Sequence, residues 1–129
     1  MSRFKFAGNF GAIHQPEYRR MARDENINPR AFRVHFAALG YANQIGHAEF
    51  GPGELAQALS IGYGRQADKA TDKAVAAAKQ MGLILPESGI RCLILPHTLF
   101  QTGKGTTYCK FHGIDIRDLA GVRSPVVPL

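Results

Sequence analysis

Residues 50–91 read FGPGELAQALSIGYGRQADKATDKAVAAAKQMGLILPESGIR, and this pattern predicts a short helix, a tight turn, a longer helix and a β-hairpin. Pro52 and Glu54 favour a helix start, because proline loses no hydrogen bond there and the carboxylate interacts favourably with the helix dipole. Gly62 and Gly64 can adopt the positive φ angles that a sharp reversal between two helices requires. The segment thus predicts two helices joined by a glycine-rich turn, with a hairpin directly after them.

The longer predicted helix, residues 65–81, has two chemically different sides. Small apolar residues gather on one side, which can pack close to a neighbouring helix. The other side carries basic and amide side chains, which can donate to phosphates and to base edges. We interpret this segment as a DNA recognition helix with the contact residues Arg65, Gln66, Lys69, Lys73 and Gln80. A solvated amphipathic helix would show a similar pattern, and the turn before and hairpin after this helix favour recognition.

The predicted hairpin has strands at residues 83–85 and 90–95, joined by the turn Pro86-Glu87-Ser88-Gly89. A hairpin directly after a recognition helix is a wing. Arg91 is the cation near the short tip of this wing. We expect either that Arg91 contacts a phosphate or that the wing only supports the helix. The predicted fold class is therefore α+β, mainly α: a winged helix-turn-helix with a β-hairpin wing.

Composition narrows the class of protein. The 129 residues suit one domain, and 16 Lys and Arg against 10 Asp and Glu give a net charge of +6, which favours polyanionic partners. The chain has no long apolar run for a membrane span and no signal-peptide pattern, so we expect a cytoplasmic protein with no membrane partner. Two cysteines do not make a disulfide scaffold.

The predicted organisation has three parts: a basic, loosely ordered N-terminal arm at 1–28, a winged helix-turn-helix domain at 29–115 and an extended C-terminal tail at 116–129. The arm carries a basic run with one helical turn indicated at 16–23, and it either follows DNA phosphates or is a solvated tail. If it follows DNA, the contacts are Arg19, Arg20 and Arg23.

A helix predicted at residues 29–45 is apolar over more than half of its circumference. Phe32, Phe36 and Leu39 lie on one side, and other apolar residues lie on another. One face would pack under the later helices, and the other would need the N-terminal arm or a second copy of the protein. The sequence therefore leaves a homodimer open.

Two pairs of potential zinc ligands begin in the second strand of the hairpin and continue after it. Thiolate and imidazole are the ligands that zinc prefers, and four of them close a tetrahedral structural site. Alternatively, Cys92 is a core thiol within a strand, and the histidines are surface residues. The zinc interpretation predicts one structural ion held by Cys92, His97, Cys109 and His112.

Several short motifs resemble one known group of proteins. They are PRAFR at 29–33, GELA at 53–56, the Ala76-x-Ala78-Lys79-x-x-Gly82 pattern, Ser88-x-x-Arg91-Cys92-Leu93-x-Leu95-Pro96, and Cys109-x-x-His112. On these motifs the chain is similar to small winged helix-turn-helix proteins encoded by actinobacteria and their phages and mobile elements, over most of residues 29–113. The resemblance implies DNA binding through residues 65–81, and it includes the cysteines and histidines in the family pattern.

Catalysis is not expected. Residues 103–107, GKGTT, lack the spacing of a phosphate-binding loop, and no oxyanion loop or orienting acid can be placed with Cys109 and His112. We expect a sequence-specific double-stranded DNA-binding protein, a transcriptional regulator of a phage or mobile element that is nucleoid-associated when bound. The alternatives are a replication or recombination accessory protein, and a protein-binding module that engages a host partner.

Overall fold

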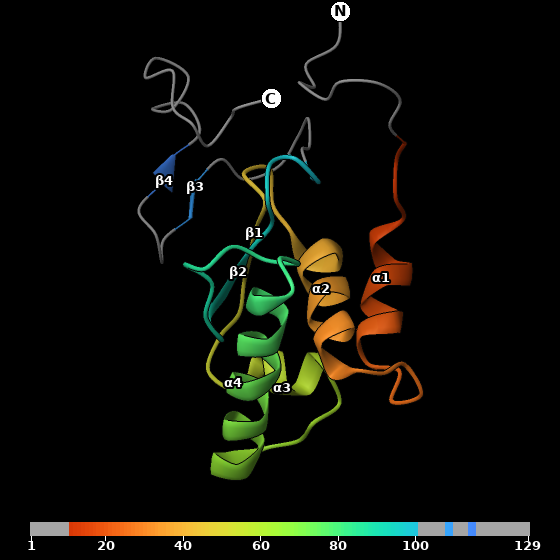
Figure 1. Cartoon of the computed structure of the whole chain (residues 1–129), viewed down its shortest axis with the longest axis vertical. Helices are drawn as coiled ribbons and strands as arrows, with labels where there is room; N and C mark the ends of the chain where they lie inside the picture. The colour runs from red at the N-terminus through yellow and green to blue at the C-terminus, as the bar shows by residue number, and fades with distance from the viewer. Residues whose placement is uncertain (1–10, 101–107, 110–113, 116–129) are drawn as a thin grey trace, which may run out of the picture.

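The computed structural model describes residues 11–100 and two further short strands, and its class is α+β, mainly helical (Figure 1). Among the described residues, two helices precede the first strand and two follow it, and the second of the later pair is the longest. In chain order the elements are α1 (Gln15–Ala22), α2 (Arg30–Tyr41), β1 (His47–Glu49), α3 (Glu54–Ala58), α4 (Gly64–Gln80), β2 (Cys92–Ile94), β3 (Tyr108–Cys109) and β4 (Ile114–Asp115).

The two helices predicted on either side of the glycine-rich turn are confirmed. Ser60, Gly62 and Gly64 have φ angles of 56°, 127° and 89°, so the reversal between α3 and α4 uses the left-handed region as expected. Helix α4 covers Gly64–Gln80, within one residue of the predicted bounds. Gly82, with φ of 75°, follows its end as a C-terminal capping glycine does.

The strand pairing differs from the predicted hairpin. Strand β2 pairs antiparallel with β1, placing His47 opposite Ile94 and Glu49 opposite Cys92. Residues 83–85 form no strand; from this segment Leu85 donates its N–H to the Ile94 carbonyl at 2.8 Å. The hairpin is thus reduced to a few bonds around its turn, and β1, which has no sequence signal, is the main partner of β2.

The helix predicted at 29–45 ends at Tyr41, four residues early. Ala42 is extended, with ψ of 139°. The Asn43 side chain then accepts hydrogen bonds from the N–H groups of Ile45 and His47, at 3.0 and 3.1 Å. An asparagine that bonds the following backbone competes with helix propagation, so the chain turns here and leads into β1.

The described part of the predicted N-terminal arm contains a helix of eight residues where the sequence indicated one helical turn, so this part is more ordered than predicted. Residues 15–22 form α1, which packs along α2 (Figure 1). Arg19 donates from Nε to the Gly40 carbonyl at 2.6 Å, and the Tyr18 and Phe36 rings meet edge to face at 5.7 Å between centroids. Helix α1 therefore covers the apolar face of α2 that the sequence left without a partner.

Helix α2 lies between α1 and α4, and it contacts both (Figure 1). The core beneath these helices is built from buried apolar side chains, which include Phe50 and Phe100 and the almost fully enclosed Leu55, Leu59, Ile84, Leu93, Leu95 and Val34. Of the helices in the described residues, none has the length and apolar character that a membrane crossing requires. The predicted tail, residues 116–129, lies outside the described residues.

Candidate nucleic-acid interface

The outer face of α4 brings together the five residues predicted for the recognition helix. The inner side of this helix buries Ala67, Thr71, Ala74, Val75 and Ala78. Thr71 satisfies its hydroxyl by donating to the Ala67 carbonyl at 2.7 Å, so its burial leaves no polar atom without a partner. The opposite side is exposed and carries Arg65, Gln66, Lys69, Lys73 and Gln80.

The charge on this face is predominantly positive. Arg65, Lys69 and Lys73 are exposed there with one carboxylate, Asp72. Ala76 and Ala77 are also exposed, and their small side chains leave room for a bulky partner to approach the helix backbone. At about 1.5 Å per residue, the 17 residues of α4 extend about 25 Å. A face of this kind can donate hydrogen bonds to phosphates and to base edges in a groove.

Tyr63 extends the face at the start of α4, and the sequence reasoning missed it. It is 81% exposed and precedes a first helical turn that contains no acidic residue and no side-chain cap. The signal that could have revealed it is an aromatic residue between two glycines, because such a turn offers no neighbouring side chain to cover the ring.

Arg91, predicted as a phosphate contact near the wing, is exposed but anchored. Its Nε donates to the Phe50 carbonyl at 2.8 Å, which ties the residue before β2 to the residue after β1. Lys79 likewise donates from Nζ to the Pro86 carbonyl at 3.3 Å. Through these bonds the two cations tie the reduced hairpin to β1 and to α4. The bonds give a structural basis to the supporting role expected of the wing.

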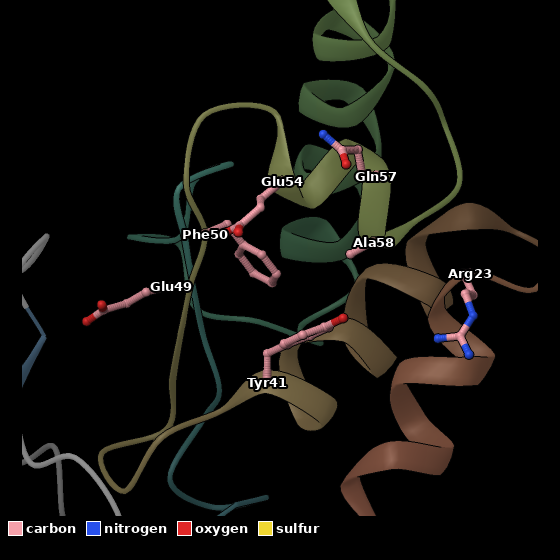
Figure 2. Close-up of a pocket in the computed structure, with 7 residues that line it drawn as sticks. All are labelled: Arg23, Tyr41, Glu49, Phe50, Glu54, Gln57 and Ala58. Carbon is pink, nitrogen blue, oxygen red and sulfur yellow. The ribbon is translucent and has the colours of Figure 1, made fainter.

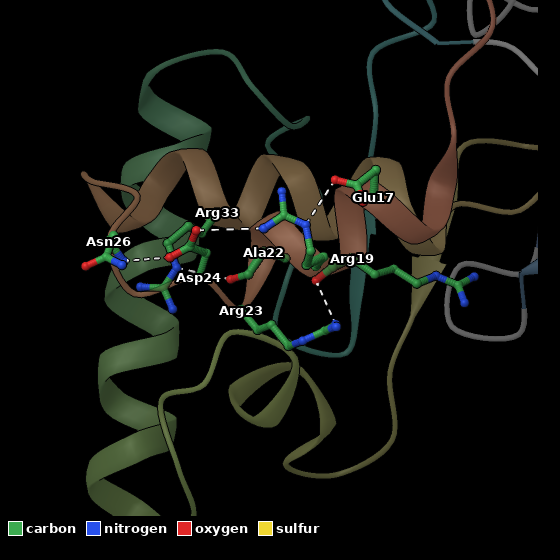
Figure 3. A network of polar contacts seen from close by, with 8 residues as sticks. Glu17, Arg19, Ala22, Arg23, Asp24, Asn26 and Arg33 are labelled. Atoms are coloured by element: carbon green, nitrogen blue, oxygen red, sulfur yellow. Dashed lines mark hydrogen bonds and ion pairs between the residues drawn. The ribbon is translucent and has the colours of Figure 1, made fainter.

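The structure does not bring the arginines of the N-terminal segment to the α4 face. They lie on or directly after α1, and α2 separates α1 from α4 (Figure 1). Arg19 lies over the Tyr41 ring at 4.5 Å, and Arg20 pairs with Glu17 at 3.0 Å. Arg23 donates to the Arg19 carbonyl at 3.3 Å. Figure 3 shows the contacts of Arg20 with Glu17 and of Arg23 with the Arg19 carbonyl, which are internal to the protein.

A hollow of about 400 Å³ opens where α2, β1 and α3 meet the end of α1 (Figure 2). Tyr41 and Phe50 meet there with their ring centroids 5.3 Å apart. Arg23 lies on one side, whereas Glu49 and Glu54 supply carboxylates. Because both signs of charge line it, this hollow does not continue the basic face of α4.

The predicted zinc ligands are only partly described. Cys92 is buried in β2, and its Sγ lies 3.5 Å from Nδ1 of His47, a residue outside the predicted set. Burial lowers the pKa of His97. Cys109 lies in β3, but its side chain and all of His112 fall outside the described residues. Within the part of the chain that is described, no three His, Cys, Asp or Glu side chains are grouped to hold a metal ion, and the zinc assignment stays a prediction.

Comparison of the chain with protein-family models, with curated proteins and with solved structures finds no match. The features that bear on function are therefore those of the chain itself. Foremost among them is a long exposed helix whose outer face gathers Arg, Lys and Gln donors.

Proposed function

We propose that this protein binds double-stranded DNA in a sequence-specific manner through α4, and that it acts as a transcriptional regulator of a phage or mobile element. One observation carries the proposal: Arg65, Gln66, Lys69, Lys73 and Gln80 share the exposed face of a single 17-residue helix. Arginine and glutamine are suited to reading base edges, and the lysines to neutralising phosphates.

The order of elements supports a winged helix-turn-helix as the fold that presents this helix. Helix α3 is short and is joined to α4 by the glycine-rich reversal, as the two helices of such a motif are. The residues after α4 return through a reduced hairpin to β2, which adds to β1. In this arrangement α4 is the recognition helix, and Tyr63 lies at the end that enters the groove first.

Selection of bound sequences from a random duplex pool tests binding and specificity together. The expected result is enrichment of one motif, and a footprint at the element's own promoter then supports regulation. A footprint at an origin or attachment site instead indicates a replication or recombination accessory protein. A pool without enrichment contradicts the proposal.

Replacement of Lys69 and Lys73 by alanine tests whether α4 is the helix that binds. On the selected duplex, each lost phosphate contact should reduce the slope of log affinity against log salt by about 0.9. The variant Arg65→Ala should instead relax the preference at one base position. Arg20→Ala is the charge-matched control, because Arg20 is exposed on α1 and pairs with Glu17. If the double lysine variant binds the selected site as the parent does, α4 is not the interface.

A further inference from the structure

A shallow groove runs beside the basic face of α4. Of the contact residues predicted from the sequence, Lys73 is the one that lines the described part of this groove. It measures about 430 Å³ and lies between the start of α2 and the side of α4. Pro29 and Arg30 line it at the start of α2, Ala70, Lys73 and Ala77 line it from α4, and Met81 lines it just after the end of α4. The groove therefore adjoins the exposed face through a residue that belongs to both.

The floor and the rims of this groove differ in chemistry. The floor is apolar and is formed by the short side chains of Ala70 and Ala77 and by Met81, which is 48% exposed. Each rim carries an exposed cation, Arg30 on α2 and Lys73 on α4. Among the described residues neither cation forms a hydrogen bond or an ion pair, in contrast with Arg19, Arg20 and Arg23. Two uncompensated cations beside an apolar strip favour an anionic partner that also has apolar surface.

A nucleic-acid backbone has this combination, because its phosphates alternate with deoxyribose rings that present C–H surface. We infer that the groove holds the sugar–phosphate backbone of one DNA strand, with Arg30 and Lys73 on phosphates and a sugar over Ala77 and Met81. The inference rests on the proposed function, and two observations support this partner: the positive charge of both rims and the continuity of the groove with the α4 face. Arg30 then takes the role that the sequence assigned to the arginines of the N-terminal segment.

The test measures binding of the selected duplex as a function of salt for the parent, Arg30→Ala, Arg30→Lys and Arg20→Ala. We expect Arg30→Ala to reduce the salt slope by about 0.9 without changing the selected sequence. Arg30→Lys should restore the slope, because an ammonium also neutralises phosphate, and Arg20→Ala should bind as the parent does. Ala77→Glu, which places a carboxylate on the groove floor, should weaken binding more than Arg30→Ala. Circular dichroism checks that each variant is folded.

The outcomes separate this inference from the function on which it rests. If the parent selects no duplex, the proposed function fails. If the parent selects a motif but Arg30→Ala retains its affinity and slope, the groove inference alone fails. A changed motif with Arg30→Ala indicates a base contact and overturns the backbone assignment. A last outcome is that Arg30→Ala binds the duplex as the parent does but, unlike the parent, does not bind polyglutamate. This result overturns the backbone assignment in favour of an acidic peptide.

Discussion

Arg33 is a charged residue in the middle of the fold, with only 2% of its surface exposed. Its guanidinium donates from Nε to the Ala22 carbonyl at 3.1 Å and from Nη2 to the Leu59 carbonyl. Burial lowers the pKa of Arg33, and the charge of Arg30 adds to this effect, while Glu25 and Asp24 oppose it. The side chain thus joins the last residue of α1 and the residue after α3 to α2.

Arg33→Ala should destabilise the protein by about 3 kcal/mol or more, because two buried carbonyls lose a charged donor and a cavity remains. Urea unfolding measures the effect. The matched control is Arg30→Ala, an exposed arginine on the same helix, which should change the unfolding free energy by about 0.5 kcal/mol or less. Equal unfolding midpoints for the two variants would show that Arg33 does not connect the helices.

His35 makes stability depend on pH. Its Nδ1 lies 3.0 Å from the Leu83 carbonyl, and the side chain is half-buried beside Phe36. Desolvation by burial lowers the pKa of His35, with the bond to Leu83 partly opposing the effect. The unfolded state, with an ordinary pKa of about 6.5, then binds the proton more readily. The stabilising contribution is present above about pH 6.5 and is lost as the pH falls toward the folded-state pKa.

Urea midpoints measured from pH 7.5 to pH 5 should therefore decrease, and His35→Asn should show a shallower decrease. Asparagine keeps a donor for the Leu83 carbonyl but does not titrate. His97 shifts in the same direction through burial, so part of the dependence should persist in the variant. A variant as pH-sensitive as the parent would assign the effect to other groups.

The docking of α1 on α2 depends on Gly40. A Cβ built at this position would lie 2.8 Å from Cγ and 2.9 Å from the backbone nitrogen of Arg19. In an isolated helix, Gly→Ala stabilises by about 1 kcal/mol. Here the sign should reverse, because the methyl group must displace α1 and break the Arg19–Gly40 bond.

Gly40→Ala should destabilise the protein by about 1–3 kcal/mol and increase hydrogen exchange at the amides of α1. Gly89→Ala is the control, since nothing lies within 4 Å of a Cβ there and its φ is not in the left-handed region. Unchanged exchange in α1 would mean that the helix tolerates a wider separation. Helix α1 thus provides the cover for α2 that the sequence left open between the N-terminal arm and a second copy, and the homodimer stays a prediction.

For the molecule as a whole, the zinc assignment makes a prediction about order after β2. If Cys92, His97, Cys109 and His112 hold one ion, protein purified without a histidine tag should contain about one equivalent of zinc. A chelator should then lower the melting temperature, and acidification should release the metal, because binding requires deprotonated thiols. Less than about a tenth of an equivalent, with unchanged melting in chelator, would leave Cys92 as a core thiol beside His47.

Local signals in the chain were enough for the two helices and their reversal. Gly62 and Gly64 mark the turn by their backbone freedom, and the periodicity of α4 separates its buried alanines from Arg65, Lys69 and Lys73. These properties depend on neighbours within one or two helical turns. The exposed side of α4, and with it most of the candidate interface, could therefore be predicted from the sequence alone.

The pairing of β1, the burial of Arg33 and the position of Arg30 depend on contacts between segments that are distant in the sequence. Strand β1 has three residues, too few to reveal a period of two, and it exists because residues 47–49 meet 92–94. Arg33 is buried because α2 places it beside the carbonyls of Ala22 and Leu59. Arg30 adjoins the α4 face only because α2 packs against α4. Such pairings join residues far apart in the chain, and a local pattern does not encode which distant surface a residue will meet.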